Sequence, residues 1–170
     1  RRGDCLLAPI PAPMIFVRAL ADLSSAELAT VGPKARACAD LLRAGFDVPN
    51  GFVVHCPHGE VPTAEVNAAA RAMGEGLLAV RSAALAEDGA GHSFAGIHAS
   101  FLNVTQAEVA QMVGLCLASM HSERAADYRA RHNLPAPAGA QTVLAQRKIG
   151  RAHVSTPVTF RNLVCRLLLE

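Results

Sequence analysis

Residues 41–54 read LLRAGFDVPNGFVV, and they predict the end of a helix, a turn and a buried strand, in that order. The helix begins near Val31-Gly32-Pro33-Lys34, because proline suits the first helical position. Gly45 ends it, because glycine adopts the left-handed conformation common after a helix. Phe52-Val53-Val54 is typical of a short buried strand. The predicted apolar stripe of the helix consists of Ala37, Cys38, Leu41 and Leu42.

The same alternation of helices and strands continues on both sides of this stretch. Ser24-Ser25-Ala26-Glu27 and Thr105-Gln106-Ala107-Glu108 each have the spacing of a capping box, which opens a helix. The second of these helices, or a successor, reaches about His132. The glycine-rich run 87–96 lacks helical periodicity and is predicted to be a mobile loop. With a further helix over 63–73 and strands over 77–81 and 142–146, the order of elements predicts an α/β or α+β domain.

The composition excludes several function classes. The chain has 170 residues, of which 51% are hydrophobic, and this suits one globular domain. A net charge of +2, with six Phe and one Tyr, provides neither a basic face nor a stacking platform, so we predict no nucleic-acid partner. No apolar run approaches the roughly 20 residues of a membrane helix, so we predict no membrane partner. Five cysteines without a Cys-x-x-Cys pair suit a reducing cytoplasm, the predicted localisation.

The two ends of the chain differ from its middle. From Ile149-Gly150-Arg151-Ala152-His153-Val154 onward, the residues resemble a conceptual translation of a common sequencing-library adapter. We therefore interpret residues 148–170 as an artefactual tail and exclude them from reasoning about the fold. Residues 1–13 precede the first methionine, Met14, and are interpreted as an untranslated or disordered leader. The predicted domain covers residues 14–147.

One group of side chains invites comparison with a metal site. His55, Cys56 and His58 lie close together in the sequence and carry atoms that can bind a metal. Pro57 lies among them and no fourth ligand is near, so the group does not complete a zinc pattern. We predict no metal site here, and we interpret the cysteines as small buried apolar residues.

Three stretches, in their order and spacing, carry a resemblance to a known family. The first is the glycine-lysine turn together with the segment LLRAGFDVPNGFVV. The second consists of AVRS at 79–82, AED at 86–88, SFAG at 93–96 and FLNV at 101–104. The third runs from Ala118-Ser119 through Tyr128-Arg129 to the strand VLAQR at 143–147. Together they resemble the nucleotide-binding domain of the pyruvate phosphate dikinase and phosphoenolpyruvate synthase family.

By that resemblance the fold is the first part of an ATP-grasp-type nucleotide-binding domain, truncated before its end. The resemblance implies ATP and Mg²⁺ as cofactors of an enzyme that passes phosphate from ATP to a carrier histidine and then to pyruvate, as pyruvate, water dikinase does. The implied partners are the missing second half of the ATP-binding domain and a phosphohistidine domain, so the fragment alone is expected to be inactive. Two alternatives stay open: a rifampicin-type antibiotic phosphotransferase, and a non-catalytic nucleotide-binding or interaction protein.

The resemblance also assigns nucleotide-binding residues, without a complete catalytic set. Lys34 matches the loop lysine that the family places at the nucleotide phosphates, and Arg81 matches the arginine of the strand motif. Lysine acts on phosphate as a point charge, whereas arginine offers planar bidentate contact. The other residues assigned to the nucleotide are Glu87, Asp88, Ser93, Gly96 and Gln146.

This chain departs from the family pattern beside both cations. Pro33 and Ala35 flank Lys34 where the family has glycines, and this restricts the approach of the backbone to phosphates. Ala83 and Leu85 replace the serine and the threonine that usually follow the strand arginine. These replacements remove hydroxyl contacts and favour the non-catalytic alternative.

Overall fold

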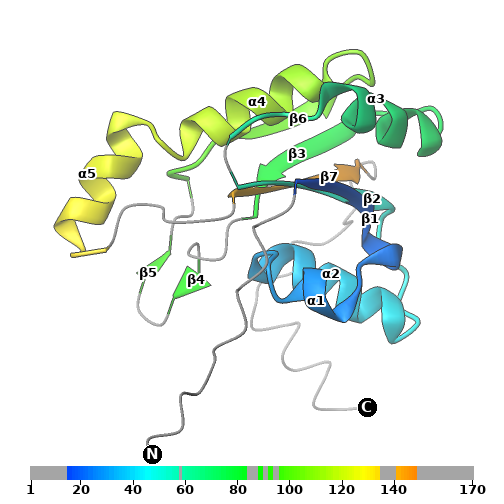
Figure 1. The fold of residues 1–170 in the computed structure, drawn as a ribbon, viewed down its shortest axis with the longest axis horizontal. Coiled ribbons are helices and arrows are strands. Elements are labelled where there is room, and N and C mark those ends of the chain that lie inside the picture. The colour runs from blue at the N-terminus through cyan, green and yellow to red at the C-terminus, as the bar shows by residue number, and fades with distance from the viewer. Residues whose placement is uncertain are drawn as a thin grey trace, which may run out of the picture.

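A computed structural model describes residues 15–57, 59–83, 88–89, 92–93, 96–134 and 141–148. Its centre is a five-stranded sheet in which every neighbouring pair of strands is antiparallel. The sheet lies between two layers of helices (Figure 1), so the predicted mixed α/β fold is confirmed. In spatial order the strands are β1 (Phe16–Ala19), β2 (Gly51–Cys56), β7 (Gln141–Arg147), β3 (Leu78–Ser82) and β6 (Ser100–Val104).

The helices divide between the two faces of the sheet (Figure 1). One face is covered by α3 (Thr63–Ala72) and α4 (Val109–Ser119), and the other by the 3₁₀ turn η1 (Leu20–Asp22), α1 (Ser25–Leu28) and α2 (Pro33–Arg43). Helix α5 (Glu123–Arg131) continues the chain beyond α4. A two-stranded hairpin of β4 (Asp88–Gly89) and β5 (His92–Ser93) pairs apart from the main sheet.

The alternation of side chains along each strand produces two hydrophobic cores, because successive strand residues point to opposite faces. On β7, Val143 and Ala145 pack with α3 and α4, whereas Leu144 between them packs with η1, α1 and α2. All six residues of β2 are buried, so this strand is covered on both faces. Burial on both faces explains why its sequence is a continuous apolar run.

Helix α2 turns a different face to the sheet from the one predicted. Its buried residues are Ala35 and Ala39, and Cys38 and Leu42 pack beside them. These four positions have the i, i+3, i+4, i+7 spacing of an apolar helical face. The predicted stripe was therefore wrong in part: Ala37 and Leu41 are exposed, because the small alanines let the helix approach the sheet closely.

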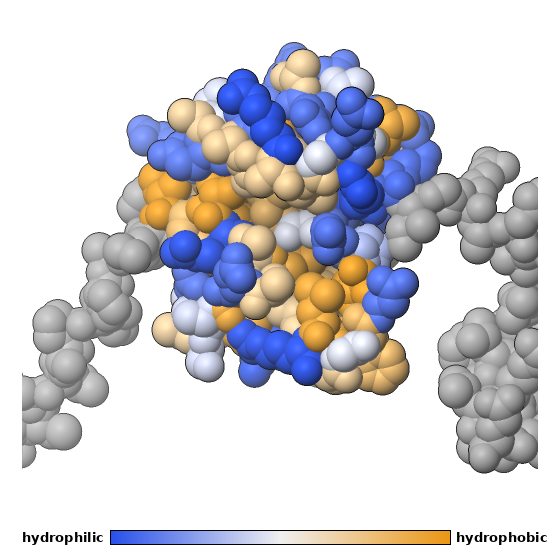
Figure 2. Space-filling view, turned by 90° about the vertical axis from the view of Figure 1, so that its right-hand side faces the viewer, coloured by the Kyte–Doolittle hydropathy of each residue, from blue (hydrophilic) through white to orange (hydrophobic). Residues whose placement is uncertain are grey.

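The end of α2 is a Schellman motif, as glycine at this position predicts. Gly45 has a φ of 83°, and its N–H donates to the carbonyl of Leu42 at 3.0 Å. The N–H of Phe46 donates to the carbonyl of Leu41, also at 3.0 Å. This motif commonly brings together the side chains at the positions of Leu41 and Phe46. Both side chains are exposed here, with Phe46 at 62%. On the side of the molecule seen in Figure 2, apolar residues form separate groups among hydrophilic ones.

The two predicted capping boxes have different outcomes. At the start of α1 both hydrogen bonds of the box between Ser24 and Glu27 are present, so that prediction is confirmed. Before α4 one half is present: the carboxylate of Glu108 accepts from the N–H and the hydroxyl of Thr105. Helix α4 begins at Val109, the residue after this carboxylate. The backbone of residues 105–108 forms a turn instead of the first helical turn.

The long helical region predicted to reach His132 consists of two helices. Ser122 is the N-cap of α5, and its hydroxyl oxygen accepts from the N–H of Ala125 at 3.3 Å. The buried guanidinium of Arg129 donates to the carbonyl of Met120, which is the C-cap of α4. A side chain of α5 therefore binds the last turn of α4 at the break between the two helices.

Several predictions lie partly or wholly outside the described residues. The leader at 1–13 is outside them, and of the tail at 148–170 only Lys148 is described, where its N–H donates to the carbonyl of Leu77 at 2.8 Å. The domain boundary at residue 147 therefore stays a prediction. Among the described residues no helix is long and apolar enough to cross a membrane.

Two glycine-to-alanine changes should shift stability in opposite directions. Gly45→Ala should lower the free energy of unfolding by about 1 kcal/mol, because an alanine strains in the left-handed conformation although no atom lies within 4 Å of the added Cβ. Gly114→Ala, in the middle of α4, should raise it by about 0.5 kcal/mol, since alanine favours helix and its Cβ would meet Val61 at an ordinary 3.7 Å. Urea unfolding of both variants measures the two shifts, and a stabilising Gly45→Ala would contradict the assigned motif.

Candidate functional site

A chain of backbone hydrogen bonds joins the start of α2 to the ends of two strands. The N–H of Gly32, the N-cap of α2, donates to the carbonyl of Ala83 at 3.0 Å. The N–H of Ala83 in turn donates to the carbonyl of Thr142 at 2.8 Å. Ala83 directly follows β3 and Thr142 lies near the start of β7. The amino-terminal end of α2 is therefore held at the end of the sheet where β3 finishes.

The first turn of α2 carries two backbone N–H groups at its amino-terminal end. Pro33 occupies the first helical position and has no N–H. The first hydrogen bond of the helix runs from the N–H of Arg36 to the carbonyl of Gly32 at 3.1 Å. The N–H groups of Lys34 and Ala35 precede this first bond and face the amino-terminal end of the helix. Together with the helix dipole, they make this end suitable for an anion, and Lys34 adds an exposed cation.

Arg81 lies on the same side of the sheet as α2. It is exposed between the buried residues Val80 and Ser82. Its cross-strand partner on β7 is Leu144, which belongs to the core beneath α2. Cross-strand partners project from the same face of a sheet. The guanidinium therefore emerges on the α2 side, beside the buried residues Leu144 and Ala83 of that core.

Gln146 shares this face. It is two residues beyond Leu144 on β7, so it is a diagonal neighbour of Arg81. Its side-chain Nε2 lies 3.6 Å from the sulfur of Cys38 and 3.5 Å from the carbonyl of Pro49. Cys38 is one helical turn after Lys34. Three of the residues predicted to bind nucleotide thus come from α2, β3 and β7 on one face.

The other predicted residues lie in or beside the hairpin. Asp88 and Ser93 are cross-strand partners, so the run predicted as a loop contains paired backbone. This corrects that prediction, because short antiparallel pairing satisfies backbone groups that a loop would expose. Gly96 follows with a φ of 74°, and Glu87 lies outside the described residues. Figure 1 places the hairpin on the side of the sheet that carries α1 and α2.

His55 and Cys56 cannot ligate one metal together. They are successive residues of β2, so their side chains point to opposite faces. Cys56 packs among the apolar residues beneath α3 and α4, and burial raises the pKa of its thiol to about 11. His58 lies outside the described residues. Within the parts of the chain that are described, no group of three or more His, Cys, Asp or Glu side chains could hold a metal ion.

The His55 ring is instead buried against an aromatic ring and a hydroxyl group. It is 1% exposed and stacks on the ring of Phe16, with the ring centroids 4.8 Å apart and an angle of 14° between their planes. Its Nδ1 lies 3.2 Å from the hydroxyl oxygen of Thr142. Removal from water lowers the pKa of His55 below its ordinary value. Burial therefore favours the neutral form of the imidazole.

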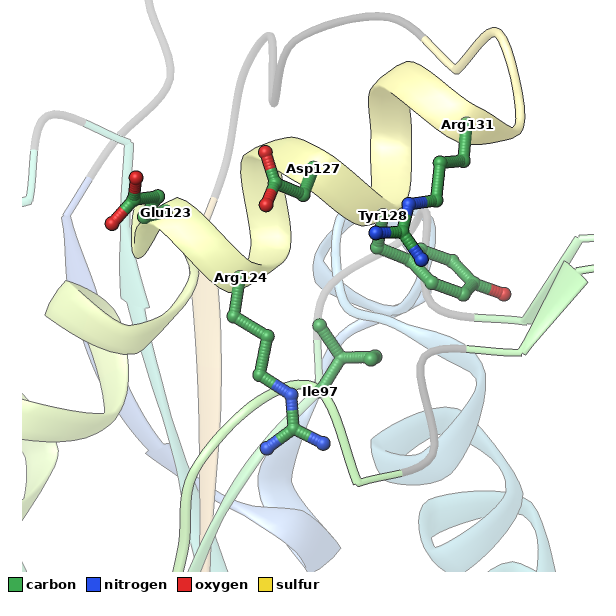
Figure 3. A pocket seen from close by; sticks show the side chains of 6 residues that line it. All are labelled: Ile97, Glu123, Arg124, Asp127, Tyr128 and Arg131. Carbon is green, nitrogen blue, oxygen red and sulfur yellow. The ribbon is translucent and has the colours of Figure 1, made fainter.

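A cavity of about 400 Å³ lies elsewhere, beside α5. Figure 3 shows Arg124 reaching from α5 toward Ile97, with Tyr128 and Arg131 further along the same helix. Two arginines and two carboxylates line the cavity, so their formal charges cancel and a triphosphate would gain less there than at α2. Lys34, Arg81 and Gln146 do not line it. Its lining residues are Ile97, Glu123, Arg124, Asp127, Tyr128 and Arg131.

The sequence did not reveal which residues assemble the site. Ala83 was read as a missing hydroxyl, whereas its backbone N–H and carbonyl link β7 to α2. Thr142 was read only as the start of a strand. Backbone hydrogen bonds between distant segments leave no signal in the residue types, so a single sequence could not have identified either residue.

A comparison with known families decides where the chain belongs. The family model described as "Pyruvate phosphate dikinase, AMP/ATP-binding domain" matches residues 57–161, more than half of the chain. The chain belongs to this family. The matched range contains Arg81 and Gln146 and begins after Lys34. It also runs past Arg147, into residues that resemble the adapter.

One curated relative shares part of the sequence. The chain is 50% identical over 62 residues to the prodigiosin synthesizing transferase PigC of Serratia marcescens. The similar region covers 35% of this chain and 7% of that protein. The chain thus spans a small part of the relative's length. The family's nucleotide-binding domain is ATP-grasp-like, which agrees with the mixed α/β fold and with the predicted resemblance.

The family implies ATP, and its catalysis implies Mg²⁺. The two backbone donors of α2 and the exposed Arg81 fit the phosphates of a nucleotide. The described residues do not supply a set of metal ligands, so they do not account for Mg²⁺.

Stability should fall on acidification because of His55. Since its pKa is lowered in the folded state, the unfolded chain binds a proton at a higher pH than the folded chain does, and protonation favours unfolding. The contribution is present above the ordinary pKa of about 6.5 and is lost as the pH falls below it, by at most about 1.4 kcal/mol per pH unit. Urea unfolding at pH 7.5 and 5.5 measures the loss. The His55→Gln variant should show a smaller loss, and an equal loss would exclude this histidine as the cause.

Proposed function

We propose that this chain binds the phosphates of ATP at the amino-terminal end of α2, beside the end of β3. The observation that carries the proposal is the bond from Gly32 to Ala83, continued to Thr142, which holds the helix end and the strand end together. Lys34 follows Gly32 by two residues, and Arg81 precedes Ala83 by two. The short separations keep both cations within reach of one polyphosphate.

The proposed contacts have distinct physical roles. The N–H groups of Lys34 and Ala35 donate to one phosphate at the positive end of the helix dipole. The ammonium of Lys34 adds charge that can follow a moving phosphoryl group. The guanidinium of Arg81 binds two oxygens in a fixed plane. Phosphoryl transfer depends on such positioning and charge neutralisation more than on covalent participation by the protein.

Gln146 and the hairpin complete the proposed site. The amide of Gln146 lies next to Arg81 on the sheet face and serves as a neutral donor or acceptor. Glu87, Asp88, Ser93 and Gly96 are proposed to bind the nucleotide as well, as the resemblance to the family implies.

In the longer protein, we propose that ATP bound here phosphorylates a carrier histidine, which passes the phosphoryl group to pyruvate. This requires the second half of the ATP-binding domain and a phosphohistidine domain, so the chain alone should bind nucleotide without turnover. We propose that ATP is accompanied by Mg²⁺ in that protein, and that the protein is cytoplasmic and binds neither nucleic acid nor membrane.

Two other functions rest on specific observations. The relative PigC is named a transferase that synthesises prodigiosin, which supports an acceptor other than pyruvate. A rifampicin-type antibiotic phosphotransferase is an alternative of this kind. A non-catalytic nucleotide-binding or interaction protein is supported by Pro33, Ala35 and Ala83, which lack the glycines and the hydroxyl of the family pattern. Assays of the longer protein with different phosphoryl acceptors distinguish an antibiotic phosphotransferase from a dikinase.

Replacing either cation should weaken ATP binding. Charge-assisted hydrogen bonds contribute about 1.5–3 kcal/mol, so Arg81→Ala and Lys34→Ala should each weaken binding by about tenfold to a hundredfold. Arg81→Lys should recover part of the loss, because it restores the charge without the bidentate geometry. Calorimetric titration of the 170-residue chain with ATP measures these affinities.

Arg36→Ala is the matched control for these variants. Arg36 is also on α2 and exposed, and its distance of 4.0 Å to Asp40 marks a weak surface ion pair. The change should leave ATP affinity within about twofold of the parent, since a general loss of positive charge is screened by salt. If Arg36→Ala weakens binding as much as Arg81→Ala does, the attraction is non-specific and the site assignment fails. If Arg81→Ala has no effect, the interaction-protein alternative is favoured.

A further inference from the structure

The hydrogen bonds that hold the end of α2 continue inward to a buried side-chain pair. Thr142 accepts the Ala83 N–H through its carbonyl, and its hydroxyl oxygen lies 3.2 Å from Nδ1 of His55. Both side chains are buried, with Thr142 at 0% and His55 at 1% exposure. One residue of β7 thus connects the interior of the sheet with the segment that supports α2.

The pair is fixed from several sides. His55 and Thr142 are cross-strand partners in the register of β2 and β7. Phe16 is the cross-strand partner of His55 on β1, and its ring stacks on the imidazole. The ring is therefore held by strands on both sides, and its Nδ1 has one direction in which to bond. Thr142 cannot move without leaving this buried nitrogen without its partner.

The chain of bonds reaches the proposed phosphate contacts in few steps. It runs from the His55 ring to Thr142, from Thr142 to Ala83, from Ala83 to Gly32, and from Gly32 to the first hydrogen bond of α2. Ala83 is 0% exposed and Gly32 is buried, so water does not compete readily for these bonds. A displacement of Thr142 changes the position of Ala83, which is the support of the helix end.

We propose that His55 and Thr142 are positioning residues that fix the amino-terminal end of α2 for phosphate binding. The proposal deepens the proposed function and rests on it. Neither side chain touches the nucleotide. They act through the backbone of Thr142, Ala83 and Gly32, by keeping the N–H groups of Lys34 and Ala35 pointed at one place.

The energetic reason lies in the buried imidazole. Removing the hydroxyl of Thr142 leaves Nδ1 without a hydrogen bond inside the protein, which is unfavourable for a buried polar atom. Relief requires a local shift of β2 against β7 at the level of Thr142. That level is where Ala83 bonds to β7, so the shift loosens the support of α2 before it reaches the rest of the sheet.

The test compares Thr142→Val, which keeps the shape of the side chain without its hydroxyl, with Thr142→Ser, which keeps the hydroxyl. Amide hydrogen exchange by NMR is measured at Gly32 and at Val113, a buried residue of α4 that reports general destabilisation. ATP affinity is measured by calorimetry on the same 170-residue chains. Thr63→Val, at the exposed start of α3, is the matched control and should change neither measurement.

The expected result is selective. In Thr142→Val the Gly32 amide should exchange at least about tenfold faster relative to Val113 than in the parent, and ATP should bind about tenfold more weakly. Thr142→Ser should restore both values, which a loss of packing alone would not predict. His55→Leu leaves the buried Thr142 hydroxyl without this partner, so it should shift both measurements in the same direction, and it provides the test if Thr142→Val does not fold.

Two results would overturn different parts of the account. If exchange at Gly32 and Val113 accelerates equally in both Thr142→Val and His55→Leu, the pair contributes to general stability and is not a positioning pair. If Gly32 exchanges selectively faster while ATP affinity is unchanged, the mechanical link is supported and the assignment of the α2 end to ATP is overturned.

Discussion

The structure depends on two hydrogen bonds made by the backbone N–H and the backbone carbonyl of Ala83. Its N–H extends the ladder between β3 and β7 by one residue, to Thr142, and its carbonyl receives the N–H of Gly32. Without this link α2 would still lie over its apolar face, but its amino-terminal end would have no fixed relation to the end of β3. Packing decides which face of α2 is buried, whereas these bonds decide where its first turn lies. The candidate site depends on that second constraint.

The sheet makes this arrangement possible because a different core packs against each of its two faces. The face beneath α3 and α4 carries the larger core, which fixes the register of the strands. The opposite face is covered by α1 and α2 around Leu144, Val53 and Ala83, and Arg81 is the exposed residue of β3 on this face. A charged residue on a strand whose other residues are buried is tolerated because its side chain is exposed to solvent. The bond between Gly32 and Ala83 ties the first turn of α2 to the end of the strand that carries Arg81, and the proposal of phosphate binding rests on this link.

Much of the fold could be predicted from local signals, and the site could not. The capping box at Ser24, the end of α2 at Gly45 and the buried strand at Phe52 depend on neighbouring residues, and each prediction is confirmed. The face of α2 was predicted wrongly in part because Ala35 and Ala39 give a weak apolar signal, although small residues pack closest. The resemblance identified Lys34 and Arg81 by motif, and membership of the family is now shown for the range containing Arg81. The roles of Ala83 and Thr142 depend on backbone contacts across the fold, and residue types do not encode them.

The measurement that tests the account most directly is an NMR titration of the isotopically labelled chain with ATP. The account predicts that the largest shifts occur in the amides of Lys34 and Ala35 and in the guanidinium of Arg81, and that they saturate together with one affinity. Inorganic triphosphate should shift the same groups, because the proposed contacts are to phosphate. If ATP shifts the groups around the α5 cavity, at Arg124, Tyr128 and Arg131, and leaves Lys34 and Ala35 unchanged, the phosphate site is not at the end of α2 and the central claim is contradicted.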